Sequence, residues 1–144
     1  MPITFHFRPE VNLVISVHKG YRTDDEFLAA WKSMYENDSF NISMNHLGDL
    51  RQAKGSGSRS SAFLRELATF VNKQYAETNA HPKMAIIAPE DPTFGIARMY
   101  EVFTDHIPRD LVIFRAVDAA LAWLGLPEDF MDNLNNDTQH NAQE

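Results

Sequence analysis

The segment of residues 83–125 constrains the fold most, because two short apolar runs each precede a stretch with helical periodicity. Residues 83–88 form the first run, and residues 93–103 follow with apolar side chains at helical spacing. Residues 111–114 form the second run, and residues 117–124 again have helical spacing. Strands that alternate with single helices are typical of a mostly parallel sheet with right-handed crossovers.

The residues before this segment predict more of the same architecture. Residues 3–7 alternate apolar and polar side chains, and residues 12–17 are continuously apolar and β-branched, so we expect two strands. Their short connection predicts antiparallel pairing. Thr23 and Glu26 have the spacing of a capping box, which predicts that the first helix begins there.

The middle of the chain contains the weakest predicted strand, at residues 46–50, followed by a Gly- and Ser-rich stretch at residues 52–61. Ser60 or Ser61 is expected to cap a helix over residues 62–77. Asp91 is expected to cap the next helix, with Pro92 at its first position.

The predicted order is therefore β-β-α-β-α-β-α-β-α. It implies a single α/β domain over residues 1–126, with a mostly parallel five-stranded sheet and four helices. The remaining residues, 127–144, are rich in acids and amides, and we expect them to form a disordered tail.

Composition limits the classes of function. Of the 144 residues, 44% are hydrophobic, and no run approaches the length of a membrane span. We find no signal peptide and expect a cytoplasmic protein. Cysteine is absent, so disulfides are excluded, and the net charge of −7 argues against nucleic-acid binding.

Several motifs resemble those of the small bacterial proteins called SpoIIAA-like or STAS/SEC14-like. They are MAIIAPED at residues 84–91, FGIARMY at 94–100, VIFR at 112–115 and AALAWLG at 119–125. The resemblance extends over residues 3–126. It implies a fold shared with two better-understood groups. Anti-sigma-factor antagonists are partner-binding switches phosphorylated on a serine after the third strand, and Sec14-type domains enclose an apolar ligand.

Candidate ligand-binding residues lie where the predicted parallel strands end, at the edge where ligands bind in open α/β sheets. Helix N-termini at this edge favour anions, so the edge would suit a ligand that carries a phosphate or a carboxylate. Ordinary helix caps and surface ion pairs would use the same residues, and position alone favours that alternative. The candidates are Tyr21, Asp49, Arg51, Glu90, Asp91, Arg98 and Arg115.

Two other features are candidates for regulation. Ser56 and Ser58 lie near the position that antagonists phosphorylate, although the aspartate that precedes the phosphorylated serine there is missing, and a solvated loop is the alternative. Phe63 and Phe70 widen the apolar face of the second helix, which either belongs wholly to the core or meets a partner chain at its edge.

No cofactor, metal or catalytic motif is recognised. The six histidines are scattered, without the spacing that metal sites commonly use. The leading hypothesis is a non-enzymatic interaction or regulatory module that binds a protein partner or forms a homodimer. The alternative is a Sec14-like carrier of a small apolar or anionic ligand, and a third hypothesis is an enzyme that uses Asp49, Arg98 and Glu90. A deep apolar cavity would favour the carrier, whereas an exposed apolar patch near Phe63 and Phe70 would favour the module.

Overall fold

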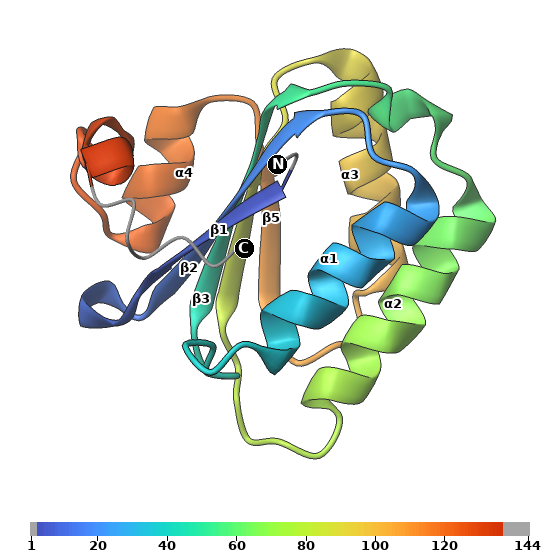
Figure 1. The fold of residues 1–144 in the computed structure, drawn as a ribbon, viewed down its shortest axis with the longest axis horizontal. Helices are drawn as coiled ribbons and strands as arrows, with labels where there is room; N and C mark the ends of the chain where they lie inside the picture. Colours follow the sequence, from blue (N-terminus) through green and yellow to red (C-terminus); the bar gives the residue numbers. More distant parts are fainter. Residues whose placement is uncertain (1–2, 137–144) are drawn as a thin grey trace.

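The computed structural model describes residues 3–136, which form a five-stranded sheet covered by helices on both faces (Figure 1). The α/β class, the mostly parallel sheet and the four helices confirm the predicted architecture. The strands are β1 (Ile3–Arg8), β2 (Leu13–Gly20), β3 (Asn45–Ala53), β4 (Lys83–Ile87) and β5 (Asp110–Phe114). The helices are α1 (Asp24–Glu36), α2 (Ser61–Tyr75), α3 (Asp91–Phe103) and α4 (Val117–Leu124), and three short 3-10 segments are η1 (Pro9–Val11), η2 (Ser56–Ser58) and η3 (Phe130–Asn136).

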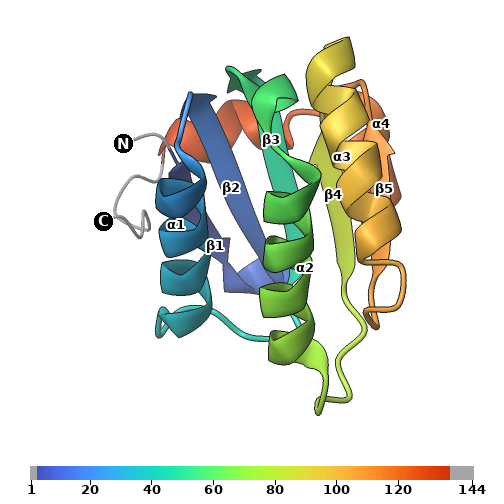
Figure 2. The ribbon, with the colours of Figure 1, turned by 90° about the vertical axis from the view of Figure 1, so that its right-hand side faces the viewer.

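The strands lie in the sheet in the same order as in the chain, β1-β2-β3-β4-β5. β1 and β2 pair antiparallel, as predicted, and the other pairs are parallel. From β2 onward, each connection through a helix therefore joins a strand to its immediate neighbour, always toward the β5 edge of the sheet. Right-handed crossovers of this kind place their helices on one face. Figure 2 shows α1, α2 and α3 side by side on that face, with α4 behind the sheet.

Local sequence signals set several of the helix ends. The capping box is present, since the Glu26 amide donates to Thr23 Oγ1 at 3.2 Å and the Thr23 amide donates to Glu26 Oε1 at 2.9 Å. Ser60 caps α2 by accepting from the Phe63 amide at 3.0 Å. α4 ends at Gly125, whose φ of 75° is in the left-handed region that glycine tolerates best.

Three boundaries differ clearly from the prediction. β2 and β3 extend to Gly20 and Ala53, because each strand continues to pair with the other beyond the apolar residues. The predicted cap at Asp91 is wrong. α3 begins at Asp91, Glu90 takes the N-cap position without a side-chain hydrogen bond, and the Asp91 carboxylate accepts from Arg115 at 2.8 Å instead.

The larger core lies between the sheet and helices α1, α2 and α3. Its aromatic centre is Trp31, which is 4% exposed and contacts the rings of Phe5, Phe27 and His46 at centroid distances of 5.2 to 5.9 Å. Ring pairs at such distances add to the stabilisation from apolar burial. This core also contains the cavity described below.

The second core lies on the opposite face, beneath α4 and η3. Leu121 of α4 and Leu134 of η3 pack there against Leu13, Ile15 and other apolar side chains of the sheet. Leu134 is 5% exposed, and its carbonyl oxygen accepts from Arg8 Nη2 at 3.3 Å. Thus η3, which lies within the stretch predicted to be a disordered tail, forms part of a core. Residues 137–144 of that tail lie outside the described residues.

Replacing Gly95 by alanine is expected to raise the free energy of unfolding by about 1 kcal/mol. Gly95 is in the first turns of α3, is exposed, has no positive φ, and leaves open space where a Cβ would lie. Alanine has the higher helix propensity by about this amount. Urea denaturation of Gly95→Ala and the wild type would measure the difference, and equal midpoints would contradict it.

Candidate functional site

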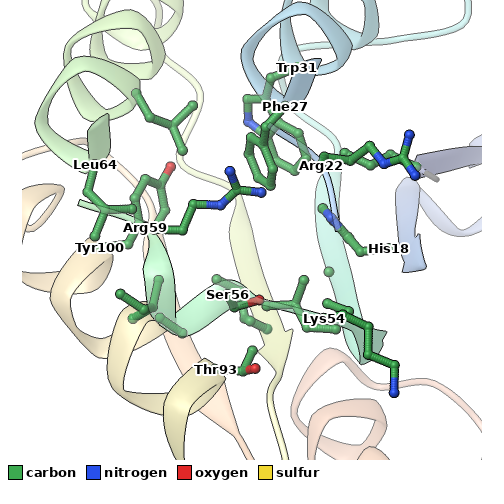
Figure 3. Close-up of a pocket in the computed structure, with 18 of the residues that line it drawn as sticks. His18, Arg22, Phe27, Trp31, Lys54, Ser56, Arg59, Leu64, Thr93 and Tyr100 are labelled. Carbon is green, nitrogen blue, oxygen red and sulfur yellow. The ribbon is translucent and has the colours of Figure 1, made fainter. Parts of the chain in front are cut away.

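An apolar cavity of about 90 Å³ lies between the sheet and the three helices α1, α2 and α3 (Figure 3). Its lining residues nearest to solvent are Lys19 and Gly20 at the end of β2 and Lys54 after β3. The cavity therefore opens at the carboxyl ends of the parallel strands, where α/β sheets commonly bind ligands. Most of its wall is apolar and comes from side chains that include Phe27, Trp31, Phe63, Leu64, Leu67 and Tyr100.

A glycine in a central strand makes part of this space. Gly48 of β3 lines the cavity between Ser16 of β2 and Ile86 of β4. A Cβ at this position would lie 3.7 Å from both the Ile86 side chain and Ser16 Oγ, which is ordinary contact. Steric exclusion of a side chain therefore does not explain the glycine, and a glycine inside a strand often marks the approach of a ligand.

A short hydrogen-bonded chain of polar side chains crosses the sheet beside the cavity. Ser16 Oγ lies 2.9 Å from His46 Nε2 and 3.0 Å from His18 Nε2, and all three residues are buried. The His18 ring lines the cavity and stacks on Phe27 at 5.6 Å, and the His46 ring stacks on Trp31 at 5.2 Å. Since one hydroxyl joins both imidazoles, these buried groups satisfy each other.

Burial keeps both rings neutral near pH 7. Desolvation lowers the pKa of His18 from 6.5 to about 4, against the opposing effect of the Asp49 carboxylate, and the Arg59 guanidinium lowers it further. Desolvation lowers the pKa of His46 to about 3, with smaller contributions from His18 and Arg109. Each neutral ring offers one donor and one acceptor, so His18 presents a neutral polar group to the cavity.

The polar part of the wall is dominated by Arg59, which follows η2. Its guanidinium donates to Asp24 Oδ1 at 2.7 Å, and its side chain is only 9% exposed. Three aromatic rings surround the cation at 5.0 to 5.4 Å, those of Tyr21, Phe27 and Phe63. In Figure 3 the guanidinium points into the space below Phe27, so contacts with aromatic faces hold it over the cavity.

Further polar groups complete the wall. Arg22 lines the cavity, and its buried Nε has no hydrogen-bond partner among residues 3–136. Thr93, in the first turn of α3, is buried, and Ser56 of η2 is half-buried. Figure 3 shows these two hydroxyl side chains across the cavity from Phe27.

The seven residues predicted to bind a ligand do not form one site. Asp49 is buried and holds Arg51 through two hydrogen bonds of 2.9 Å. In β3 they alternate with the cavity-lining residues Gly48 and Leu50, so they lie on the face covered by α4 and η3.

Four of the other five predicted residues lie at the surface around α3, and Tyr21 lies near Gly55. Asp91 pairs with Arg115 at 2.8 Å, and Arg98 pairs with Glu101 at 2.8 Å. Glu90 is exposed at the N-cap. Tyr21 is 47% exposed and packs against Gly55, where a Cβ would lie 2.8 Å from the ring. Tyr21 contacts Arg59 and so borders the mouth of the cavity.

The residues predicted to be phosphorylated or to meet a partner are partly enclosed. Ser56 lines the cavity, and the exposed Ser58 donates its hydroxyl to the Gly55 carbonyl oxygen at 2.7 Å. Phe63 is 5% exposed and belongs to the cavity wall. Phe70 is half-buried against the Tyr35 ring, at 5.7 Å.

No protein-family model, no curated protein and no solved structure matches this chain. Within residues 3–136, no three His, Cys, Asp or Glu side chains are grouped to hold a metal ion. No helix in the same range is long and apolar enough to cross a membrane. The site is therefore described from its own geometry.

Sequence reasoning did not identify the residues that make the cavity, chiefly Gly48, His18, Arg22 and Arg59. Arg59 carried a signal, because it is the one charged residue in the Gly- and Ser-rich stretch of residues 55–61 between a strand and a helix. Gly48 carried a second signal, as a glycine within a strand. Neither signal shows that the two residues face the same cavity.

Proposed function

We propose that this protein is a binding module for a small and largely apolar molecule. The observation that carries the proposal is the apolar cavity of about 90 Å³ that opens at the carboxyl ends of the strands. Concave, mostly apolar sites with a few polar groups are typical of small-molecule binding. The resemblance of the sequence to SEC14-like domains supports the same proposal.

The geometry supports binding more than catalysis. The enzyme hypothesis requires Asp49, Arg98 and Glu90 to act together, but Asp49 faces α4 and η3 while the other two are on α3. No hydrogen bond or ion pair in the described part of the chain joins any two of them. Ser16 lies beside two imidazoles, but it is fully buried and is not part of the cavity wall.

The hypothesis of a protein-interaction module has less support from the positions of Phe63 and Phe70. It requires an apolar patch at Phe63 and Phe70 that a partner can cover. Phe63 is already buried, and Phe70 packs against Tyr35 with the Lys32 ammonium 5.8 Å from its ring centre. The cavity is therefore the feature on which we base the function.

Filling the cavity from its floor is expected to abolish binding without unfolding the protein. Gly48→Val would place methyl groups in the space, and its Cβ has only ordinary contacts. Valine also has the higher strand propensity. Titration of the ¹⁵N-labelled protein with benzamide and with hexanamide, two neutral probes, should shift cavity amides such as Gly20 and Thr93 in the wild type. The shifts should be lost in Gly48→Val.

Gly95→Ala is the matched control, because it also adds a side chain to a glycine but lies outside the cavity wall. It should bind as the wild type does. Native mass spectrometry of the purified protein, before and after denaturation, would show whether a ligand is carried from the cell. The proposal is refuted if neither probe shifts the cavity amides of the wild type, or if Gly48→Val binds them equally well.

A further inference from the structure

The charge around the cavity is opposite in sign to that of the chain. The chain has 20 Asp and Glu against 13 Lys and Arg. Among the described residues that line the cavity, none is Asp or Glu, whereas Lys19, Arg22, Lys54 and Arg59 all contribute to the wall. A site lined by one sign of charge, with apolar walls, attracts ligands of the other sign.

Arg59 is much more buried than an arginine in an ordinary surface ion pair. Its side chain is 9% exposed, but that of its partner Asp24 is 45% exposed. A guanidinium has five N–H donors, and within residues 3–136 the Arg59 side chain makes one hydrogen bond, from Nη1 to Asp24. Since aromatic rings fix the group from several sides, its unused donors are in place for a second acceptor.

Arg22 gives an independent indication. Its Nε is buried in the cavity wall, and no acceptor contacts it in the described part of the chain. A buried donor without a partner costs free energy, and a bound acceptor would remove that cost. In Figure 3 Arg22 and His18 lie on the same side of the cavity, the Arg22 guanidinium is directed away from Arg59, and Arg59 reaches into the middle from the other side.

We propose that the ligand is a monocarboxylate, whose apolar part fills the cavity and whose carboxylate binds Arg59, with the Arg22 Nε, unpaired within residues 3–136, as a further donor in the wall. The inference rests on the proposed ligand-binding function. A carboxylate can accept two parallel hydrogen bonds from the fork of a guanidinium, whereas in the described range Asp24 accepts only one, from Arg59 Nη1. A dianionic phosphate would be repelled more strongly by Asp24. The volume equals that of about three water molecules, so the enclosed space holds a few methylene groups, and a ring or a longer acyl chain extends into the open mouth.

Isosteric pairs of probes test the charge separately from the apolar part. Benzoate is compared with benzamide, and hexanoate with hexanamide, by NMR titration of the wild-type protein at 0.15 M salt. Each carboxylate should bind about 10- to 100-fold more tightly than its amide, the range expected for hydrogen bonds to charged groups. Arg59→Gln should bring this ratio close to one, whatever it does to the affinity for the amide. Arg65→Gln, which removes an exposed arginine outside the cavity wall, should leave the ratio unchanged.

A second variant is expected to increase the affinity for benzoate. A misfolded protein would not show such a gain. Asp24→Asn removes the carboxylate that occupies Arg59, so it should raise the affinity for benzoate several-fold and leave benzamide unaffected. Asp25→Asn removes the same charge one residue away, at an exposed position that does not contact Arg59, and should have a smaller effect. A folded Asp24→Asn protein with no gain for benzoate over Asp25→Asn would overturn the role of Arg59.

The outcomes separate this inference from the proposed function. If the amides bind and the carboxylates bind no more tightly, the cavity is indifferent to charge, and the inference fails while the proposed function stands. If phenyl phosphate binds more tightly than benzoate, the preference for a carboxylate is overturned. If no probe shifts the cavity amides, the proposed function fails.

Discussion

The free energy of unfolding is expected to fall steeply between pH 6.5 and about pH 4, because the fold buries two neutral histidines. In the folded protein the pKa of His18 is about 4 and that of His46 about 3, both below the value of 6.5 without burial. Between these values the unfolded chain binds protons that the folded protein does not, so acid favours unfolding. Their contribution to stability is complete above pH 6.5 and is lost as the pH falls toward the folded-state values.

The slope should be on the order of 1.4 kcal/mol per pH unit for each histidine over this window. Over two or more pH units, both together would change stability by several kcal/mol, which is a large part of the total for a domain of this size. Urea denaturation at pH values from 4 to 8 would measure the slope. His46→Gln should reduce it by roughly the contribution of one histidine, whatever the variant does to stability at pH 7.

His106→Gln is the matched control, since it makes the same substitution at an exposed ring outside both cores. His18→Gln should behave as His46→Gln does. If His18→Gln and His46→Gln both keep the full wild-type slope of the free energy of unfolding against pH, the two rings do not remain neutral in the folded protein. The hydrogen-bonded side chains of His18, Ser16 and His46 would then include a protonated imidazole.

Removing residues from Phe130 onward is expected to lower the free energy of unfolding by about 3 to 5 kcal/mol. Leu134 is buried against the second core, and Phe130 and Met131 are partly buried against it. Burial of each such side chain contributes about 1.5 to 3 kcal/mol when complete. The shortened chain would also lose the hydrogen bond from Arg8 to the Leu134 carbonyl oxygen.

A chain that ends at Asn136 is the reference for this experiment. The difference in the free energy of unfolding between this chain and one that ends at Asp129 is then due to η3 alone. Urea denaturation of the two chains would give the difference. In the full chain, Leu134→Ala should lower stability by about 2 to 3 kcal/mol. Equal midpoints for the two shortened chains would mean that η3 does not stabilise the sheet.

The order of strands and helices could be predicted from the sequence, because each depends on side chains close together in the chain. The apolar runs, the periodicity of the helices and the caps at Thr23 and Ser60 all act within a few residues. Boundaries that depend on pairing with another segment were predicted less well, as the extension of β2 and β3 shows. The cap of α3 was misplaced because Pro92 is accepted at the second helical position as well as the first.

The second core illustrates what local patterns miss. Phe130, Met131 and Leu134 stand among acids and amides, and by composition their segment predicts disorder. Their burial becomes apparent only when α4 is placed on the face of the sheet opposite to the other helices. The candidate ligand residues are separated for a similar reason, since alternation along β3 places Asp49 and Arg51 on that second face.

The sequence by itself determined the α/β class, the antiparallel first pair and most helix ends, since hydrophobic periodicity and capping are local properties. Only the tertiary structure decided where the site lies. The cavity lies over Gly48, which carries no side chain, and the segments that precede α1 and α2 bring Arg22 and Arg59, which are far apart in the chain, to the same wall. The physical reason is that a cavity and its charge depend on long-range packing, which no pattern of neighbouring residues contains.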